Sequence, residues 1–209
     1  RQGHVVPECA ARFTLGMAKL CRGNPVDAER ELRDAFDLAR DRGEWALVAR
    51  ARLSIARVHL TRGEPSGALG EVGKARDLAQ RLEDSLLEVE SMISLARLHM
   101  FLGQVKRAGL LLEQAQERVA EKGIALPGPN ISMLQASVIL ARAGRGEEAD
   151  LDKAAALFDV AEREGHSSTR RGLRAEIDCA RAALFLQRGD AASARERAES
   201  ALEIAKVTG

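Results

Sequence analysis

The chain repeats one pattern of small residues at intervals of forty residues, which limits the folds open to it. In the clearest copy, Ala56 is followed by Gly63, Ala68 and Ala75. The other copies are Gly16, Gly23, Ala28 and Ala35; Ala96, Gly103, Ala108 and Ala115; Ser137, Gly144, Ala154 and Ala161, with five extra residues inside; and Ala182, Gly189, Ala194 and Ala201. A fixed period in this range is typical of proteins that stack one supersecondary unit many times.

The composition favours helices. Ala, Leu, Arg and Glu are abundant, tyrosine is absent, and aromatic residues make up 3% of the chain. Sheets favour β-branched and aromatic residues instead. A formal net charge of +1 gives no bulk attraction to nucleic acid or to an acidic membrane. No apolar run approaches the roughly 20 residues of a membrane span. We therefore predict a helical protein of the cytoplasm, with neither membrane nor nucleic acid as a partner.

Each copy of the pattern predicts two helices joined by a short glycine turn, which form an antiparallel hairpin. The first small residue of each copy would let the two helices of one hairpin approach closely. One hairpin cannot bury its apolar face alone, so hairpins stack on their neighbours. We predict an all-α, right-handed superhelical solenoid of five hairpins and ten helices, with the first helices lining the concave side.

The whole chain, residues 1–209, is predicted to be one solenoid domain. The expected repeats are residues 6–43, 44–83, 84–126, 127–168 and 169–209. Because the first residue is Arg1 rather than Met, we expect the chain to be part of a longer protein. Gly123–Asn130 is predicted to be a helix-free loop because it contains two prolines.

Three glycines interrupt the second helix of the second repeat: Gly67, Gly70 and Gly73. Each costs up to about 1 kcal/mol of helix propensity relative to alanine. Two interpretations remain open: the glycines permit a neighbouring helix to approach closely, or the fold simply tolerates a weak helix.

No sequence motif for catalysis is present, and we predict neither an enzyme nor a bound cofactor or metal. The phosphate-binding, zinc-protease and nucleophile-elbow motifs are all absent. His59 and His99 occupy equivalent positions in adjacent repeats, without further ligands in register, so semi-buried packing is expected. Cys9, Cys21 and Cys179 form no close-spaced pair, and each is expected to pack as a small hydrophobic residue.

The four small-residue positions, with the glycine between the two helices, resemble the tetratricopeptide repeat (TPR). Four of the five copies match at all four positions. The chain departs from that family in its forty-residue period and in lacking the helix-ending proline. The early tryptophan of the family is also replaced, for example by Arg12 and Arg52. Long repeats of this kind resemble the arrays of bacterial signalling ATPases and of LuxR-type transcription regulators such as the maltose regulator, and the Ala/Arg-rich composition suggests a bacterial source.

The resemblance implies a binding groove along the first helices. Its positions fall on Arg50, Leu53, Ser54, Arg57, Glu90, Ile93, Ser94, Arg97, Met100, Phe101, Leu134, Val138 and Arg142. Arg57 and Arg97 are equivalent residues one repeat apart, and adjacent guanidinium groups can bind the carboxylates of an acidic peptide or of a C-terminus. The alternative is that these arginines pair with Glu90 and with solvent.

We therefore predict a non-catalytic scaffold of a bacterial regulatory or signalling protein, which binds a protein or peptide through the groove. The alternative is an effector-sensing or self-association module of a LuxR-type regulator, in which the groove takes a small effector or a second copy of the chain.

Overall fold

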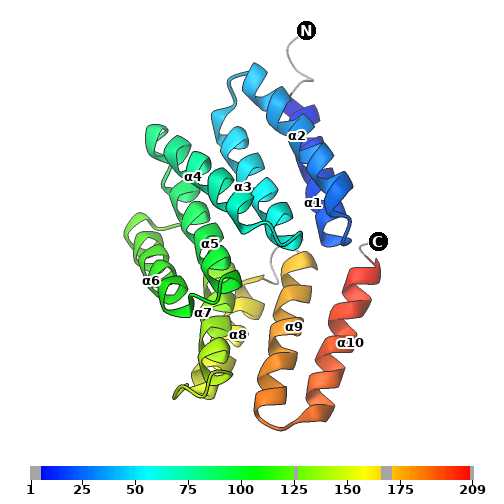
Figure 1. Cartoon of the computed structure of the whole chain (residues 1–209), viewed down its shortest axis with the longest axis vertical. Coiled ribbons are helices and arrows are strands. Elements are labelled where there is room, and N and C mark those ends of the chain that lie inside the picture. The colour runs from blue at the N-terminus through cyan, green and yellow to red at the C-terminus, as the bar shows by residue number, and fades with distance from the viewer. Residues whose placement is uncertain (1–5, 125–126, 166–170, 208–209) are drawn as a thin grey trace. The chain divides into compact units, whose positions relative to one another are not determined.

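The computed structural model describes residues 6–124, 127–165 and 171–207. Within these ranges the chain forms α-helices and turns, with no strand (Figure 1). The helices are α1 (Val6–Cys21), α2 (Pro25–Asp41), α3 (Trp45–Thr61), α4 (Pro65–Arg81), α5 (Ser85–Phe101), α6 (Val105–Lys122), α7 (Gly128–Ala143), α8 (Leu151–Gly165), α9 (Arg171–Gln187) and α10 (Ala191–Val207). The predicted all-α class and the ten helices are confirmed for these residues.

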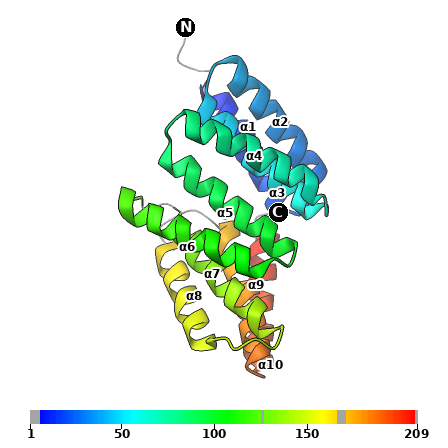
Figure 2. The same ribbon diagram turned by 60° about the vertical axis from the view of Figure 1, so that its left-hand side comes forward.

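The chain forms two compact units, Arg1–Leu102 and Gly103–Gly209. In the first unit, α1 pairs with α2 and α3 pairs with α4, and two views show each pair side by side (Figures 1 and 2). In the second unit, α7 pairs with α8 and α9 pairs with α10. Between pairs, α2 packs on α3 and α4 on α5 in the first unit, and α6 packs on α7 and α8 on α9 in the second.

Consecutive helices therefore pack as the repeat predicts within each unit. The single solenoid domain, its right-handed superhelix and its concave side stay predictions. The repeat boundary predicted between residues 168 and 169 lies outside the described residues.

A glycine in the left-handed region of backbone space ends the first helix of the second hairpin. Gly63 has φ +75°, and the next N–H, from Glu64, donates a 2.8 Å hydrogen bond to the carbonyl of His59. This closure satisfies a carbonyl that the end of the helix would otherwise leave unpaired. The equivalent turn between α7 and α8 spans residues 144–150 instead of three residues, which confirms the predicted insertion.

The predicted loop Gly123–Asn130 is wrong in its second half, because α7 already begins at Gly128. Pro129 lies in the first turn of that helix, where its missing N–H costs no hydrogen bond and its fixed φ suits a helix. The proline that suggested a loop therefore marks the start of a helix. Gly123 itself ends α6 with φ +64°.

The first small residue of the repeat brings the helices of a hairpin together. A Cβ added to Gly16 of α1 would lie 2.7 Å from Cγ of Leu32 in α2 and 3.2 Å from the carbonyl oxygen of Ala28. The equivalent Ala56 and Ala96 are 2% and 0% exposed. The alanines twelve residues further along are also buried, with exposed fractions of 0–4%: Ala28, Ala68, Ala108, Ala154 and Ala194. Small side chains thus occupy positions where larger ones would separate the helices.

The three glycines of α4 differ in their surroundings. A Cβ on Gly67 would lie 2.9 Å from Nδ1 of His59, on α3. A Cβ on Gly70 or Gly73 would meet nothing within 4 Å. The close-approach interpretation therefore holds for Gly67, and the tolerance interpretation holds for the other two.

Replacing Gly70 or Gly73 by alanine is expected to stabilise the first unit by about 0.5–1 kcal/mol each, because alanine restricts the unfolded chain and favours helix. Gly67→Ala is the matched control on the same helix and is expected to give no such gain, because the His59 ring must move. Urea unfolding followed by the fluorescence of Trp45, the single tryptophan, measures all three. Equal gains at all three positions would contradict this account.

Candidate functional site

An ion pair aligns the first helices of two neighbouring repeats in the first unit. Nε of Arg50 on α3 lies 3.5 Å from Oε2 of Glu90 on α5, and the two side chains are 40% and 34% exposed. The sequence assigned both residues to the groove but considered Glu90 only as a partner for Arg57 and Arg97. The pair shows that these faces of α3 and α5 lie side by side.

The two predicted groove arginines lie seven residues beyond this pair, Arg57 on α3 and Arg97 on α5. Seven residues are about two helical turns, or roughly 10 Å along the axis, so they lie on the same helix faces as Arg50 and Glu90. Both arginines are half-buried, and each already has an interaction within the chain. Near the end of α5, Met100 is half-buried and Phe101 is 52% exposed.

Three predicted groove residues lie mainly inside the unit. Leu53 and Ile93 are each 7% exposed, and Ser54 is 6% exposed. Leu53 belongs to the apolar core between α3, α4 and α5. Ser94 is half-buried and its hydroxyl donates a 2.9 Å hydrogen bond to the carbonyl of Glu90. We call the surface that carries Arg50, Arg57, Glu90 and Arg97 the α3–α5 face. Leu53, Ile93, Ser54 and Ser94 lie mostly beneath this surface and support it.

The remaining predicted groove residues belong to the second unit. Leu134 and Val138 on α7 are 6% and 9% exposed. Arg142, near the end of α7, has a 46% exposed side chain, and its Nε lies 3.1 Å from Oε2 of Glu147. Of these three predicted groove residues, Arg142 is the one that carries a charge.

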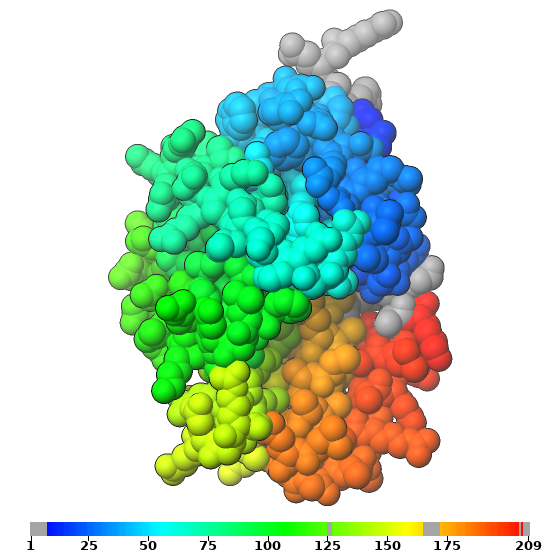
Figure 3. Space-filling view, viewed as in Figure 1, coloured from blue at the N-terminus to red at the C-terminus, as the bar shows by residue number. Residues whose placement is uncertain are grey.

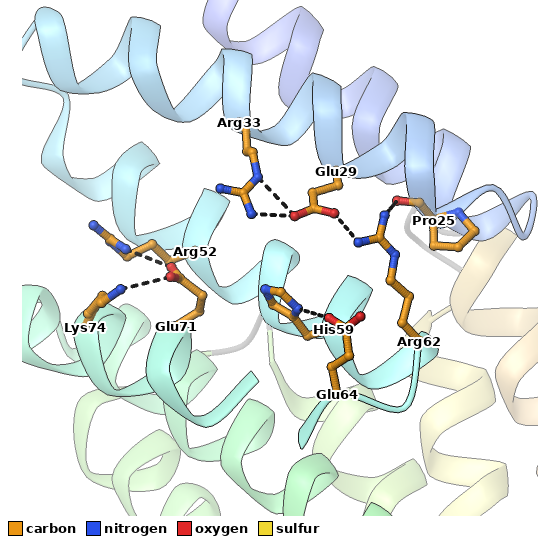
Figure 4. Close-up of polar contacts among 9 residues, drawn as sticks. All are labelled: Pro25, Glu29, Arg33, Arg52, His59, Arg62, Glu64, Glu71 and Lys74. Carbon is orange, nitrogen blue, oxygen red and sulfur yellow. Dashed lines mark hydrogen bonds and ion pairs between the residues drawn. The ribbon is translucent and has the colours of Figure 1, made fainter. Parts of the chain in front are cut away.

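A carboxylate that the sequence analysis overlooked joins the first two hairpins (Figure 4). Glu29 on α2 has a 13% exposed side chain and accepts a 3.0 Å hydrogen bond from Nε of Arg33. It also pairs with Arg62 in the turn after α3. Arg62 further donates to the carbonyl of Pro25 at 3.4 Å. These contacts tie the end of α3 to the start of α2, and no sequence spacing marks the pair.

A second carboxylate joins the two helices of the second hairpin. Glu71 on α4 accepts a 2.7 Å hydrogen bond from Arg52 on α3 and lies 3.1 Å from Nζ of Lys74 (Figure 4). The guanidinium of Arg52 also lies 4.6 Å from the ring centroid of Phe36 on α2, a cation–π distance. Arg52 stands where the TPR pattern has tryptophan, and here it connects α2, α3 and α4.

Both carboxylates have a lowered pKa. Burial raises the pKa of Glu29, but the hydrogen bonds and charges of Arg33 and Arg62 outweigh this, so the net pKa falls below 4.5. Burial likewise raises the pKa of Glu71, and hydrogen bonds from Arg52 and Lys74, together with their charges, lower it overall. The ionised form of each carboxylate therefore stabilises the folded first unit.

Stability is expected to fall as the pH drops below about 4.5, the usual pKa of glutamate. A carboxylate with a lowered folded-state pKa contributes stability above its unfolded pKa and loses it as the pH falls through the folded value. Glu29→Gln/Glu71→Gln should be less stable than the parent near neutral pH and approach it in acid. Melting temperatures across pH 2–7 measure this. Parallel curves for the two proteins would contradict the assignment.

The histidine and cysteine predictions have mixed outcomes. His59 is semi-buried as expected, but its Nδ1 also lies 2.7 Å from Oε2 of Glu64, a contact the sequence did not predict. Cys9 is fully buried, as predicted. The prediction is wrong for Cys21 and Cys179, which are exposed. Cys21 ends α1 and Cys179 lies on an outer face of α9, so neither faces a neighbouring helix closely enough for burial.

Within the described ranges, no group of three or more His, Cys, Asp or Glu side chains is arranged to hold a metal ion. Among the helices that the structure describes, none is both long and apolar enough to cross a membrane. The charged side chains described above form ion pairs, and the arginines Arg50, Arg57 and Arg97 lie on the α3–α5 face.

Comparisons with known proteins support the fold. No family model matches the chain, and no curated protein matches it either. Two similar solved structures contain nearly identical TPR-like repeats from a Podosopora anserina protein described as a kinesin light chain. One, a point variant, has a TM-score of 0.55 and 19% identity over 100% of this chain and 99% of that chain. The other has a TM-score of 0.55 and 18% identity over 100% and 97%. The chain therefore has a TPR-like fold.

Proposed function

We propose that the chain is a scaffold that binds an acidic segment, or the C-terminal carboxylate, of a partner protein on the α3–α5 face. The observation that carries this proposal is the Arg50–Glu90 ion pair, at 3.5 Å. At this position, opposite charges on neighbouring first helices neutralise each other. Seven residues further along each helix, on the same faces, are Arg57 on α3 and Arg97 on α5, and both side chains are positive.

Two cations on adjacent helices favour an anion between them. A guanidinium group forks onto a carboxylate with two parallel hydrogen bonds, and such charged bonds are stronger than neutral ones. Arg57 and Arg97 each have interactions within the chain, so a partner carboxylate shares or replaces these contacts. Because both side chains are half-buried, a bound carboxylate is screened less by solvent than at a fully exposed site.

Apolar surface lies near the arginines. Phe101 is 52% exposed and follows half-buried Met100 at the end of α5. An apolar side chain of a bound peptide, beside its carboxylate, would contact this surface. The proposed partner is therefore an acidic peptide that also carries an apolar residue.

The proposal also includes the setting, a regulatory or signalling protein of the bacterial cytoplasm. This part rests on the forty-residue period and on the Ala/Arg-rich composition.

Fluorescence anisotropy with three labelled peptides tests the proposal. The first has glutamate residues, one phenylalanine and a free C-terminus; the second is its amidated form; the third replaces glutamate by glutamine. Arg57→Glu/Arg97→Glu is expected to weaken binding of the first peptide at least 100-fold, because two charged hydrogen bonds contribute about 1.5–3 kcal/mol each. Binding should also weaken as salt concentration rises.

Arg76→Glu/Arg81→Glu is the matched control. Both residues are exposed on α4, and the substitution changes the net charge of the chain by the same amount. The control should bind the first peptide as the parent does. Equal losses of affinity in both variants would show that net charge, and not the α3–α5 face, causes the effect. Equal binding of the glutamate and glutamine peptides would reject the proposal.

A further inference from the structure

Two register positions of the repeat hold matched residues, one on the first helix of a hairpin and one on the second. They stand four residues before the first small residue of the pattern and three residues after the third. We call them the pairing positions. The five pairs are Arg12 with Glu31, Arg52 with Glu71, Met92 with Leu111, Met133 with Leu157, and Asp178 with Arg197. Each pair is therefore either two opposite charges or two apolar residues.

The charged pairs of the first unit form contacts across their hairpins. Nη1 of Arg52 on α3 lies 2.7 Å from Oε2 of Glu71 on α4 (Figure 4). Nη1 of Arg12 on α1 lies 3.5 Å from Oε2 of Glu31 on α2. In both hairpins the first helix supplies the arginine and the second helix supplies the glutamate.

The last hairpin has the same kind of contact with the charges exchanged between its helices. Nη1 of Arg197 on α10 donates a 3.0 Å hydrogen bond to Oδ1 of Asp178 on α9. The hydroxyl of Ser200 donates a 2.9 Å hydrogen bond to Oδ2 of the same carboxylate. Asp178 is 2% exposed, so its charge depends on such donors for stabilisation. The two helices pack against each other, and their surfaces adjoin in orange and red in Figure 3.

An exchange of second helices between these hairpins would bring like charges together. If α10 paired with α3, Arg197 would lie opposite Arg52. If α4 paired with α9, Glu71 would lie opposite Asp178, and the buried carboxylate would lose its arginine, which is strongly destabilising. Opposite Met133 of the fourth hairpin, either charge would have no partner. Wrong pairing of similar units is a characteristic error in the folding of repeat proteins, so the type of pair distinguishes correct from incorrect hairpins.

We propose that the pairing positions decide which second helix pairs with which first helix. The chain has three kinds of hairpin: arginine with glutamate in the first two, apolar residues in the third and fourth, and aspartate with arginine in the last. The exchanged charges keep α10 from pairing with α1 or α3, and keep α2 and α4 from pairing with α9. None of the pairing positions is a predicted groove residue, so this proposal is independent of the α3–α5 face.

Charge exchange in the last hairpin tests the pairing. Asp178→Arg places two guanidinium groups opposite each other and is expected to lower the melting temperature by roughly 6–20 °C. Adding Arg197→Glu recreates the pair of the second hairpin and should recover most of this loss. The control is Arg195→Glu, which breaks an exposed pair with Glu199 on the same helix and should shift the melting temperature by at most about 4 °C.

The reciprocal exchange keeps the test decisive if arginine does not fit at residue 178. Arg52→Asp should lower the melting temperature, and Arg52→Asp/Glu71→Arg, which recreates the pair of the last hairpin, should recover most of the loss. Far-UV circular dichroism follows the melting of every variant. If neither double variant recovers the loss of its single variant, the proposal is overturned.

Refolding from urea tests the choice of partner helix. Analytical ultracentrifugation gives the mass of each protein before unfolding and after refolding at rising protein concentration. Asp178→Arg/Arg197→Glu has a last hairpin of the same kind as the first two, so roughly twice the parent's fraction or more should end in exchanged oligomers or aggregates. Arg195→Glu/Glu199→Arg exchanges an exposed pair on the same helix and should refold as the parent does. Equal refolding of all three proteins overturns the proposal, since the pairing positions would then stabilise hairpins without selecting them.

Discussion

Phe158→Ala is expected to lower the free energy of unfolding of the second unit by about 3–5 kcal/mol. Phe158 on α8 is 0% exposed and is among the largest fully buried side chains of the described residues. It occupies the repeat position held by Leu32 in the first hairpin. Truncation removes a large apolar group from between packed helices and leaves a cavity that α7 and α9, which both pack on α8, fill only in part. Urea unfolding followed by far-UV circular dichroism measures the loss.

Phe158→Leu separates cavity formation from a general intolerance of change. Leucine is the residue at the equivalent Leu32 and Leu112, both fully buried, so the position accepts that shape elsewhere in the chain. The leucine variant is therefore expected to cost less than the alanine variant, by at least about 1 kcal/mol. Equal costs for the two variants would show that the loss does not depend on the volume removed.

Leu32→Ala is expected to cost the first unit about 2–5 kcal/mol. Leu32 on α2 is 0% exposed and packs with Leu20 on α1 and with Ile55 and Val58 on α3. Its loss therefore weakens both the first hairpin and the contact of that hairpin with the next one. Trp45 at the start of α3 gives the fluorescence signal for this unit.

Gly16 makes the second prediction more specific. Gly16→Ala alone is expected to destabilise the unit by about 1–3 kcal/mol, because its Cβ would lie 2.7 Å from Cγ of Leu32. In the Leu32→Ala background that atom is gone, and the new methyl group fills part of the cavity. The double variant should therefore cost clearly less than the sum of the two single changes. Additive costs would show that Gly16 and Leu32 do not share this space.

The repeat predicted the helices well because their signals are local. Glycine turns, the small-residue positions and the helical spacing of apolar residues all act within one hairpin, so the described residues form the ten predicted helices. The start of α7 was mispredicted because proline is compatible with either a loop or a first helical turn. Choosing between them depends on which residues the helix buries, such as Pro129 and Ile131.

The candidate site was less accessible from the sequence. The repeat register placed Arg57 and Arg97 in equivalent positions, but only the packed helices showed that Arg50 lies beside Glu90. The contacts of Glu29 with Arg62 and of Glu64 with His59 also depend on how turns meet helices in space. Side-chain length and rotamer decide such pairs, and spacing along the chain does not encode them.

The sequence by itself determined the repeat, the all-α class and the positions where small residues let helices approach, because each follows from local helix and turn preferences. Only the tertiary structure decided which members of one register row are buried. Leu15 and Ile55 occupy the same row, yet Leu15 is 44% exposed and Ile55 is 5% exposed. The difference lies in the neighbouring helix: α2 packs against α3, whereas no described helix precedes α1. Burial depends on which helix packs against a residue, whereas the repeat pattern shows only which residues occupy equivalent positions.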